Sequence, residues 1–285
     1  MTDPINTILQ RGALLLSLFA TYGITVGTPA TALASVTYGT SYMNDWTGCE
    51  CSGSSLTYTD DQITMLRSEL ASGNHTADFF FANSTVWASD LLEDKDFGGE
   101  DNLYGDNVDL FAFSGHGGAT TNTWGQEYIA PFCDSGSSNT CLFKAETARF
   151  GERSGPYSTP HPGNLRYLIL ATCESVHTAP NDQWIQSFWY GLDAVMGYRG
   201  LSADSYTTDE VLADFASTSF NGSTDLKAGW FWAIEDWWVN DTGSIIVSGS
   251  SAAEASTRLN NIDAGWARRD PAIIHTYVDW AWHEG

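Results

Sequence analysis

The sequence predicts a three-layer α/β domain with a mostly parallel central sheet, and two observations lead to this fold class. Short apolar runs alternate along the chain with segments in which apolar residues recur at helical spacing. The most strand-like run, Leu165–Ala171 (LRYLILA), is apolar at nearly every position, as a central parallel strand buried on both faces should be. Parallel strands need crossover connections, and the intervening helical segments supply them.

The first half of the pattern contains three expected strands and one expected helix. The strands are Ser35–Met43, a buried run at Ala77–Ala82 (ADFFFA), and Val108–Phe113 (VDLFAF). The helix should begin at Thr59-Asp60-Asp61-Gln62, which resembles a capping box, and end at Gly73. A long polar segment then leads to Leu165.

The second half repeats the alternation. Expected strands are Ala194–Tyr198 (AVMGY) and Ile273–Val278. Three expected helices are marked by apolar residues on one face: Trp184, Ile185, Phe188, Trp189 and Leu192, with a cap at Asn181 or Asp182; Val211, Leu212 and Phe215; and Leu226, Trp230, Ile234 and Trp237 or Trp238. Aromatic residues at this spacing indicate core packing.

The first 34 residues are typical of a secretory signal peptide. Arg11 precedes an apolar run, Gly12–Val26, and Ala32-Leu33-Ala34 has the small residues of a signal-peptidase site. The alternative is a membrane anchor, but the run is shorter than the roughly 20 residues that a span needs. We expect cleavage before Ser35, a secreted protein, and a single α/β domain over residues 35–285.

The charge excludes two classes of partner. Thirty-five acidic residues against 12 basic ones give a formal net charge of -23. A polyanion repels nucleic acid and anionic membrane surfaces, so neither is an expected partner once the signal is removed. Salt-rich water would screen the self-repulsion of such a chain.

Five cysteines in an exported chain predict disulfides and one unpaired thiol. Cys133 and Cys141 flank a Ser/Gly/Asn loop and can pair with each other; alternatively, Cys49 and Cys51 each pair with one of them. In either case Cys173 is the unpaired residue. The Cys49/Cys51 pair lacks the second pair of ligands that a structural metal site needs.

Two predicted strands run directly into reactive side chains. VDLFAF is followed by Ser114-Gly115-His116-Gly117-Gly118, and LRYLILA is followed by Thr172-Cys173-Glu174-Ser175. The carboxyl ends of parallel strands meet at one edge of a sheet, where ligands bind. A histidine that removes a thiol proton and a cysteine that attacks as thiolate suffice for acyl transfer. A backbone N–H of Gly117 or Gly118, together with that of Cys173, is expected to bind the oxyanion, because the glycines let a substrate carbonyl approach the backbone.

A strand ending in Ser-Gly-His-Gly and a strand ending in Cys-Glu-Ser resemble the cysteine peptidase group of caspases, legumains, gingipains and clostripain. The resemblance implies a caspase-hemoglobinase fold, with His116 as the base and acid, Cys173 as the nucleophile, and no cofactor required. It also implies that the N–H groups of Gly117 and Cys173 form the oxyanion site. Over Trp87–Trp238 the chain is also similar to bacterial and archaeal domains of unknown function. It departs from the peptidases by placing Ala171 and Thr172 before the cysteine. Such enzymes select substrates with charged residues near the site, a role for which Arg199 is the candidate.

Other titratable residues have weaker assignments. His177 is a rival base because it follows Cys173 closely, whereas His75, His161, His275 and His283 belong to no recognisable constellation. The acidic residues between Asp90 and Asp109 are expected to form a solvated face, with oxygen ligation of Ca²⁺ as the alternative; they are Asp90, Glu93, Asp94, Asp96, Glu100, Asp101, Asp106 and Asp109.

The sequence leaves three alternative hypotheses for the function. The first is a secreted cysteine endopeptidase that cleaves peptide or protein substrates through a thioester acyl-enzyme. The second is a catalytically silent binding or surface domain on the same fold, with Cys173 as an unreactive thiol. The third is a cysteine hydrolase or acyltransferase that acts on a non-peptide bond.

Overall fold

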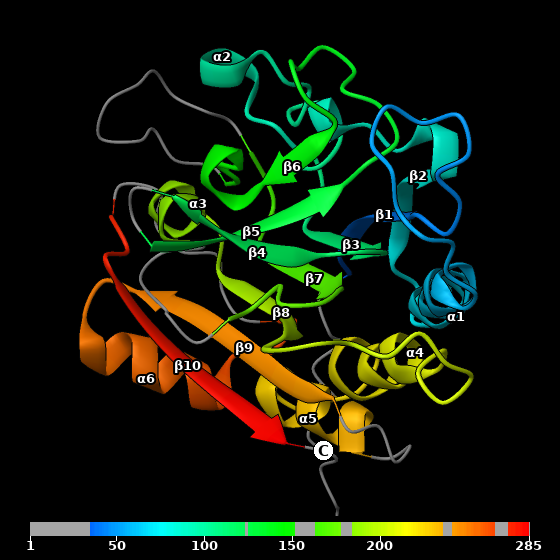
Figure 1. Cartoon of the computed structure of the whole chain (residues 1–285). Coiled ribbons are helices and arrows are strands. Elements are labelled where there is room, and N and C mark those ends of the chain that lie inside the picture. Colours follow the sequence, from blue (N-terminus) through cyan, green and yellow to red (C-terminus); the bar gives the residue numbers. More distant parts are fainter. Residues whose placement is uncertain are drawn as a thin grey trace, which may run out of the picture. The chain divides into compact units, whose positions relative to one another are not determined.

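The computed structural model describes residues 35–122, 125–151, 163–177, 184–235, 241–265 and 273–284 (Figure 1). The predicted signal peptide lies outside them. Within these ranges a seven-stranded sheet has the order β10-β9-β8-β7-β3-β1-β2. Its strands are β1 (Thr37–Tyr42), β2 (Thr76–Ala82), β3 (Leu110–Ser114), β7 (Tyr167–Ala171), β8 (Ala194–Tyr198), β9 (Thr242–Gly249) and β10 (Tyr277–Glu284). Strands β2, β1, β3, β7 and β8 run parallel, whereas β9 and β10 are antiparallel to their neighbours.

Helices cover one face of this sheet (Figure 1). They are α1 (Thr59–Ser72), α4 (Val211–Phe215), α5 (Leu226–Glu235) and α6 (Ala252–Asn261), and a π-helical turn, η4 (Ala216–Phe220), continues α4. Successive side chains of a strand point to opposite faces. Leu110 and Ala112 of β3 therefore pack with Leu66 of α1 on the helical side, while Phe111 and Phe113 pack on the other side.

The opposite face is covered by a second, three-stranded antiparallel sheet together with helix α3 (Ile185–Tyr190). Its strands are β4 (Gly118–Asn122), β5 (Gly125–Pro131) and β6 (Leu142–Lys144). Phe132, directly after β5, stacks on Phe143 of β6 and contacts Phe113 of the main sheet edge-on, with ring centroids 5.7 and 4.8 Å away. The long polar segment before Leu165, for which we predicted no strands, thus forms a structural layer.

The remaining helical elements are short. Single turns are found at η1 (Asn83–Thr85), η2 (Ala88–Asp90), α2 (Asp94–Phe97) and η3 (Ala145–Thr147). No helix in the described ranges is long and apolar enough to cross a membrane.

The predicted fold class is confirmed at the level of an α/β protein with a large, mostly parallel central sheet flanked by helices. Strand β7 lies between β3 and β8 with every residue buried, as predicted. Strand β10 covers the expected final strand but begins later, at Tyr277. Strand β9 and helix α6 were not anticipated, and the proposed helical positions Asn181, Asp182, Trp237 and Trp238 lie outside the described residues.

Two local predictions were wrong. Strand β2 was expected to be buried, but it is the edge of the sheet and most of its side chains are exposed or half-exposed. The capping box at Thr59 does not form, because the Thr59 hydroxyl donates to the Met43 carbonyl and Gln62 is engaged elsewhere. Both errors have the same cause: neighbours distant in sequence decided what these residues contact.

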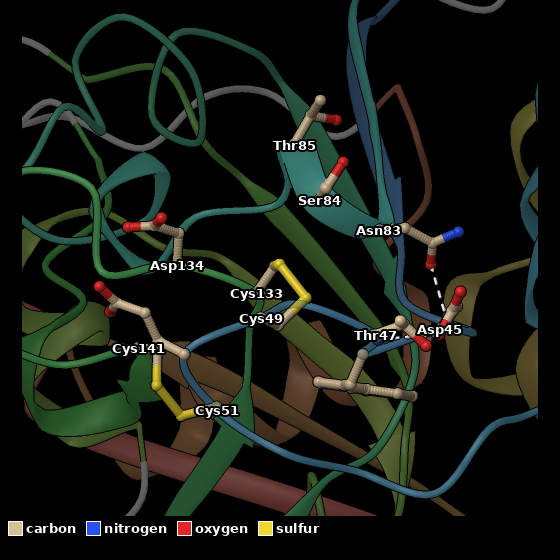
Figure 2. Close-up of a disulfide and its surroundings, with 12 residues drawn as sticks. Asp45, Thr47, Cys49, Cys51, Asn83, Ser84, Thr85, Cys133, Asp134 and Cys141 are labelled. Carbon is tan, nitrogen blue, oxygen red and sulfur yellow. Dashed lines mark hydrogen bonds between the residues drawn. A yellow bond between two sulfur atoms is a disulfide. The ribbon is translucent and has the colours of Figure 1, made fainter.

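Two disulfides join the loop after β1 to the second sheet (Figure 2). Cys49 pairs with Cys133, and Cys51 pairs with Cys141. The alternative in which each residue of the Cys-x-Cys pair reaches across to the later loop is therefore the observed one, and Cys173 is the free thiol, as predicted. Asn83, also drawn in Figure 2, accepts hydrogen bonds from the backbone N–H groups of Asn44 and Asp45 and holds the start of the same loop.

Candidate functional site

The structure brings His116 and Cys173 to one pocket. Strands β3 and β7 are neighbours in parallel register, with Ser114 opposite Ala171 at their carboxyl ends. His116 and Cys173 each follow two residues later, so the adjacent strand ends deliver both side chains to the same edge. The pocket has a volume of about 110 Å³. Its lining residues are Leu56, Thr59, Gln62, Gly115, His116, Ala171, Cys173, Ser202, Ala203 and Asp204.

The loop that carries the disulfides orients the imidazole of His116. Nε2 lies 2.8 Å from the Ser54 carbonyl oxygen and 3.0 Å from the Ser54 hydroxyl. The ring also packs against Trp46, with centroids 4.9 Å apart. A Cβ at Gly53 would approach both rings, to 2.8 Å from Trp46 and 2.9 Å from His116. If Nε2 donates its proton to the Ser54 carbonyl, Nδ1 is the nitrogen that can accept one.

The half-buried thiol of Cys173 contacts the loop after β8. The backbone N–H of Ser202 donates to Sγ over 3.3 Å, and Sγ lies 3.7 Å from the Ser202 carbonyl oxygen. A thiolate at Sγ would accept a charge-assisted hydrogen bond from this N–H group.

The turn after β7 places Cys173 through its neighbours. Glu174 has a φ of 53°, the left-handed conformation that costs a non-glycine residue energy, and its N–H donates to the Gly200 carbonyl over 2.7 Å. The Glu174 carboxylate accepts the N–H of Ala119, which links the cysteine turn to the histidine loop. Buried Ser175 donates to Leu170 and Thr172 carbonyls and accepts the N–H of Tyr198.

The residues before the cysteine have distinct surroundings. Ala171 lines the pocket. Thr172 is buried against the second sheet, with its hydroxyl 2.8 Å from the Tyr128 hydroxyl. The threonine that departs from the peptidase pattern therefore belongs to the interface between layers, outside the pocket lining.

Gly117 is required by close packing of the two loops. A Cβ there would lie 2.7 Å from the Cys173 carbonyl oxygen and 2.7 Å from Thr172 Oγ1. The histidine loop can thus approach the cysteine turn only because this residue has no side chain. The assignment of the Gly117 and Cys173 N–H groups to an oxyanion site remains a prediction.

Arg199 lies away from the pocket lining. Its guanidinium stacks on the ring of Trp282 in β10, 4.5 Å from the ring centroid. The carboxylate that does line the pocket is Asp204, which the sequence analysis did not single out. Ser54, Trp46 and Ser202 were also missed; the Gly/Ser-rich loop that contains Cys49 and Cys51 was the one available signal for the first two.

Of the other histidines in the described residues, none lines the pocket; His161 lies outside the described residues. His177 follows the cysteine turn but does not line the pocket. Buried His75 contacts the Val36 N–H and the Phe220 carbonyl. A chain of contacts like that of a catalytic triad joins Ser248, His275 and Glu254. Ser248 Oγ lies 2.9 Å from His275 Nδ1, and His275 Nε2 lies 3.7 Å from the Glu254 carboxylate. Because Ser248 is buried and donates to the Leu192 carbonyl, this group is structural.

The predicted solvated acidic face was wrong for four of its members. Asp90, Glu93, Asp101 and Asp106, in the segment of the chain that connects β2 to β3, are buried. Their carboxylates accept backbone N–H groups; Asp106, for example, accepts those of Gly151 and Leu165. Burial raises the pKa of Asp90 to about 7, and burial with the charges of Glu93 and Asp94 raises the pKa of Asp101 to about 8. Across the described residues, no three His, Cys, Asp or Glu side chains are grouped as a metal site requires.

These observations define an α/β protein with a histidine and a cysteine at the carboxyl edge of its parallel sheet. The model of a family described as a domain of unknown function, DUF6345, matches residues 42–282, and the chain belongs to this family. Among curated proteins, none matches the chain.

Proposed function

We propose that this protein is a secreted cysteine endopeptidase in which His116 and Cys173 form the catalytic dyad. The observation that carries the proposal is the shared pocket: two adjacent parallel strands end in these two side chains, and both line the same cavity. A caspase-hemoglobinase fold is the architecture we propose for it, on the basis of the two motifs and the order of the parallel strands.

The proposed reaction uses groups that are already held in place. Nδ1 of His116 takes the thiol proton, and the Cys173 thiolate attacks the carbonyl carbon of the scissile bond, which forms a C–S bond. N–H groups of Gly117 and Cys173 stabilise the oxyanion. The imidazolium then protonates the leaving amine as the C–N bond breaks, leaving a thioester. Water, deprotonated by His116, hydrolyses the thioester and restores the thiol.

The Ser54 carbonyl has the role of the third group in this scheme. It accepts a hydrogen bond from the N–H at Nε2, which sets the tautomer that leaves Nδ1 basic. It also stabilises the imidazolium once both nitrogens are protonated. Reaction of the thiol requires release of its contact with the Ser202 carbonyl, while the Ser202 N–H stays as a donor to the thiolate.

One observation favours the catalytically silent alternative. In this structure the thiol contacts Ser202 and the imidazole contacts Ser54, so each dyad member already has a hydrogen-bond partner of its own. A binding domain on the same fold would need no more than this.

Labelling of the thiol decides between the two. We expect Cys173 in the folded, secreted protein to react with iodoacetamide faster than a free thiol, and the purified protein to digest a peptide library. Cys173→Ala should abolish both, and His116→Ala should lower both about 100-fold or more. His177→Ala is the matched control, because this nearby histidine does not line the pocket; it should change neither. A rate equal to that of a free thiol, with no peptide cleaved, would exclude the peptidase; fast labelling without peptide cleavage would favour the hydrolase of a non-peptide bond.

A further inference from the structure

The pocket has one acidic side chain in its lining, and this side chain is placed where it can contact a substrate. Of the described residues that line the cavity, Asp204 is the one with a carboxyl group. It lies in the loop after β8, next to Ala203 and close in sequence to Ser202, which contacts the Cys173 sulfur. The same short loop therefore contacts the nucleophile and presents a negative charge at the cavity.

Two other polar side chains of the lining, Gln62 and Thr59, are engaged within the protein. The Gln62 amide donates to the Thr208 carbonyl and accepts from the Ser114 hydroxyl, and the Thr59 hydroxyl donates to the Met43 carbonyl. Such groups have little capacity left for a ligand. Recognition of a side chain in this pocket therefore depends mainly on the loop after β8.

Asp204 is held in a fixed position and keeps capacity to bind. Oδ2 accepts the N–H of Thr57 over 2.6 Å, and Oδ1 accepts the N–H of Tyr58 over 2.8 Å. Each carboxylate oxygen has a second lone pair, so two further hydrogen bonds can be accepted. The side chain is exposed, and the two N–H groups that it contacts carry no formal charge.

We propose that Asp204 selects substrates with a basic side chain, Lys or Arg, in the residue before the scissile bond. The inference rests on the proposed peptidase function. An ammonium or guanidinium group gives a pre-positioned carboxylate both charge and donors, whereas an acidic side chain is repelled by it. In this assignment Asp204 takes the substrate-selecting role for which Arg199 was the candidate, and the Arg199 guanidinium lies on Trp282.

The test compares electrophilic probes that differ in one side chain. Acyloxymethyl ketones of Arg, Ala and Asp are reacted with the wild type, and alkylation of Cys173 is followed by mass spectrometry. We expect the Arg probe to react at least about tenfold faster than the other two. Asp204→Asn should remove that ratio, because it should slow the Arg probe far more than the Ala probe. Asp61→Asn is the matched control, since this exposed acid in the first turn of α1 does not line the pocket; it should keep the ratio.

A second measurement uses the wild type alone, because Asp204→Asn also weakens the hydrogen bonds to Thr57 and Tyr58. Butylguanidinium and its neutral isostere butylurea are added during labelling with iodoacetamide. We expect the cation to slow alkylation of Cys173 and the urea to have little effect. Equal protection by both, or a faster reaction of the Ala or Asp probe, would overturn the role of Asp204 and leave the peptidase intact. Failure of all three probes to exceed the rate of a free thiol would overturn both.

Discussion

The contacts that orient His116 come from neighbours far away in the chain. Ser54, which contacts Nε2, is 62 residues distant in sequence. Trp46 and Gly53 complete the surroundings of the ring. The Ser-Gly-His-Gly motif placed the histidine at a strand end, but it held no information about the groups that orient the imidazole.

A single methyl group at Gly53 tests this orientation. Gly53→Ala would place Cβ within 2.9 Å of the His116 ring and 2.8 Å of Trp46. We expect the imidazole to shift, labelling of Cys173 to slow about tenfold or more, and stability to fall by about 1–3 kcal/mol. Gly200→Ala is the matched control, because a Cβ there has nothing within 4 Å. Equal labelling rates in the two variants would contradict the assigned role of the loop; urea unfolding measures the stability.

The buried acids make stability depend on pH. The pKa of Asp101 is about 8 in the folded protein, above its value in the unfolded chain. The folded state therefore holds a proton that the unfolded state releases between about pH 4 and pH 8. The free energy of unfolding should decline as pH rises through this window, on the order of a few kcal/mol, and be highest on the acidic side.

Asp101→Asn removes this titration and should flatten the decline, which urea unfolding at several pH values measures. The matched control, Asp61→Asn, should keep the wild-type decline, since Asp61 is exposed. An unchanged slope in Asp101→Asn would show that this carboxyl is not the source. Repeating the series with Ca²⁺ tests the cation hypothesis: stabilisation by Ca²⁺ that disappears in Asp101→Asn would show that these acids bind the ion.

At the scale of elements, the loop between β1 and α1 connects the disulfides to the site. It carries Cys49 and Cys51, which bond to the second sheet, and Ser54, which contacts His116. The cross-links therefore do more than stabilise the fold, because they hold the segment that orients the imidazole.

Removal of one cross-link should loosen that segment. We expect Cys51→Ser with Cys141→Ser to lower stability by about 2–4 kcal/mol and to slow the labelling of Cys173 in protein that is still folded. Circular dichroism establishes folding, and mass spectrometry follows the alkylation. The pair Cys49→Ser with Cys133→Ser, further from Ser54 in sequence, should affect stability similarly and labelling less. Unchanged labelling in the first pair would separate the disulfides from the site.

The elements differ in how far local sequence predicts them. Strands β3 and β7 are buried on both faces, so their continuous apolar runs identified them. Strands β4 and β6 were missed, because GATTN and LFK are short and carry little apolar pattern. Helix α1 has its predicted start and end, but Asp204 of a distant loop binds the N–H groups before it.

For the whole molecule, the predicted cleavage site lies directly before Ser35, the first residue that the structure describes. The Ser35 hydroxyl donates to the Asn74 carbonyl, and the Val36 N–H donates to His75 Nδ1. Residues directly after the predicted cleavage site are thus part of the folded structure. Two disulfides agree with an oxidising compartment.

We expect the secreted chain to begin at or within a few residues of Ser35, which intact-mass measurement would show. A chain expressed from Ser35 should unfold at the same temperature as the secreted form. One that begins at Tyr38 loses these two contacts, the hydrogen bonds of Thr37 to Asp109 and the buried Val36 side chain, and should be less stable by about 3 kcal/mol or more. A mature start well beyond Thr37 would contradict the predicted cleavage site.

The sequence by itself determined the alternation of strands and helices, the central position of Leu165–Ala171, the free thiol at Cys173, and the meeting of His116 with Cys173. These follow from local apolar pattern and from the rule that parallel strand ends share an edge. The tertiary structure alone decided the disulfide pairing, the burial of Asp90 and Asp101, the contact of Ser54 with His116, and the place of Asp204 in the pocket. Each of these is a contact between segments distant in the chain, which local pattern does not encode because it depends on how the loops pack.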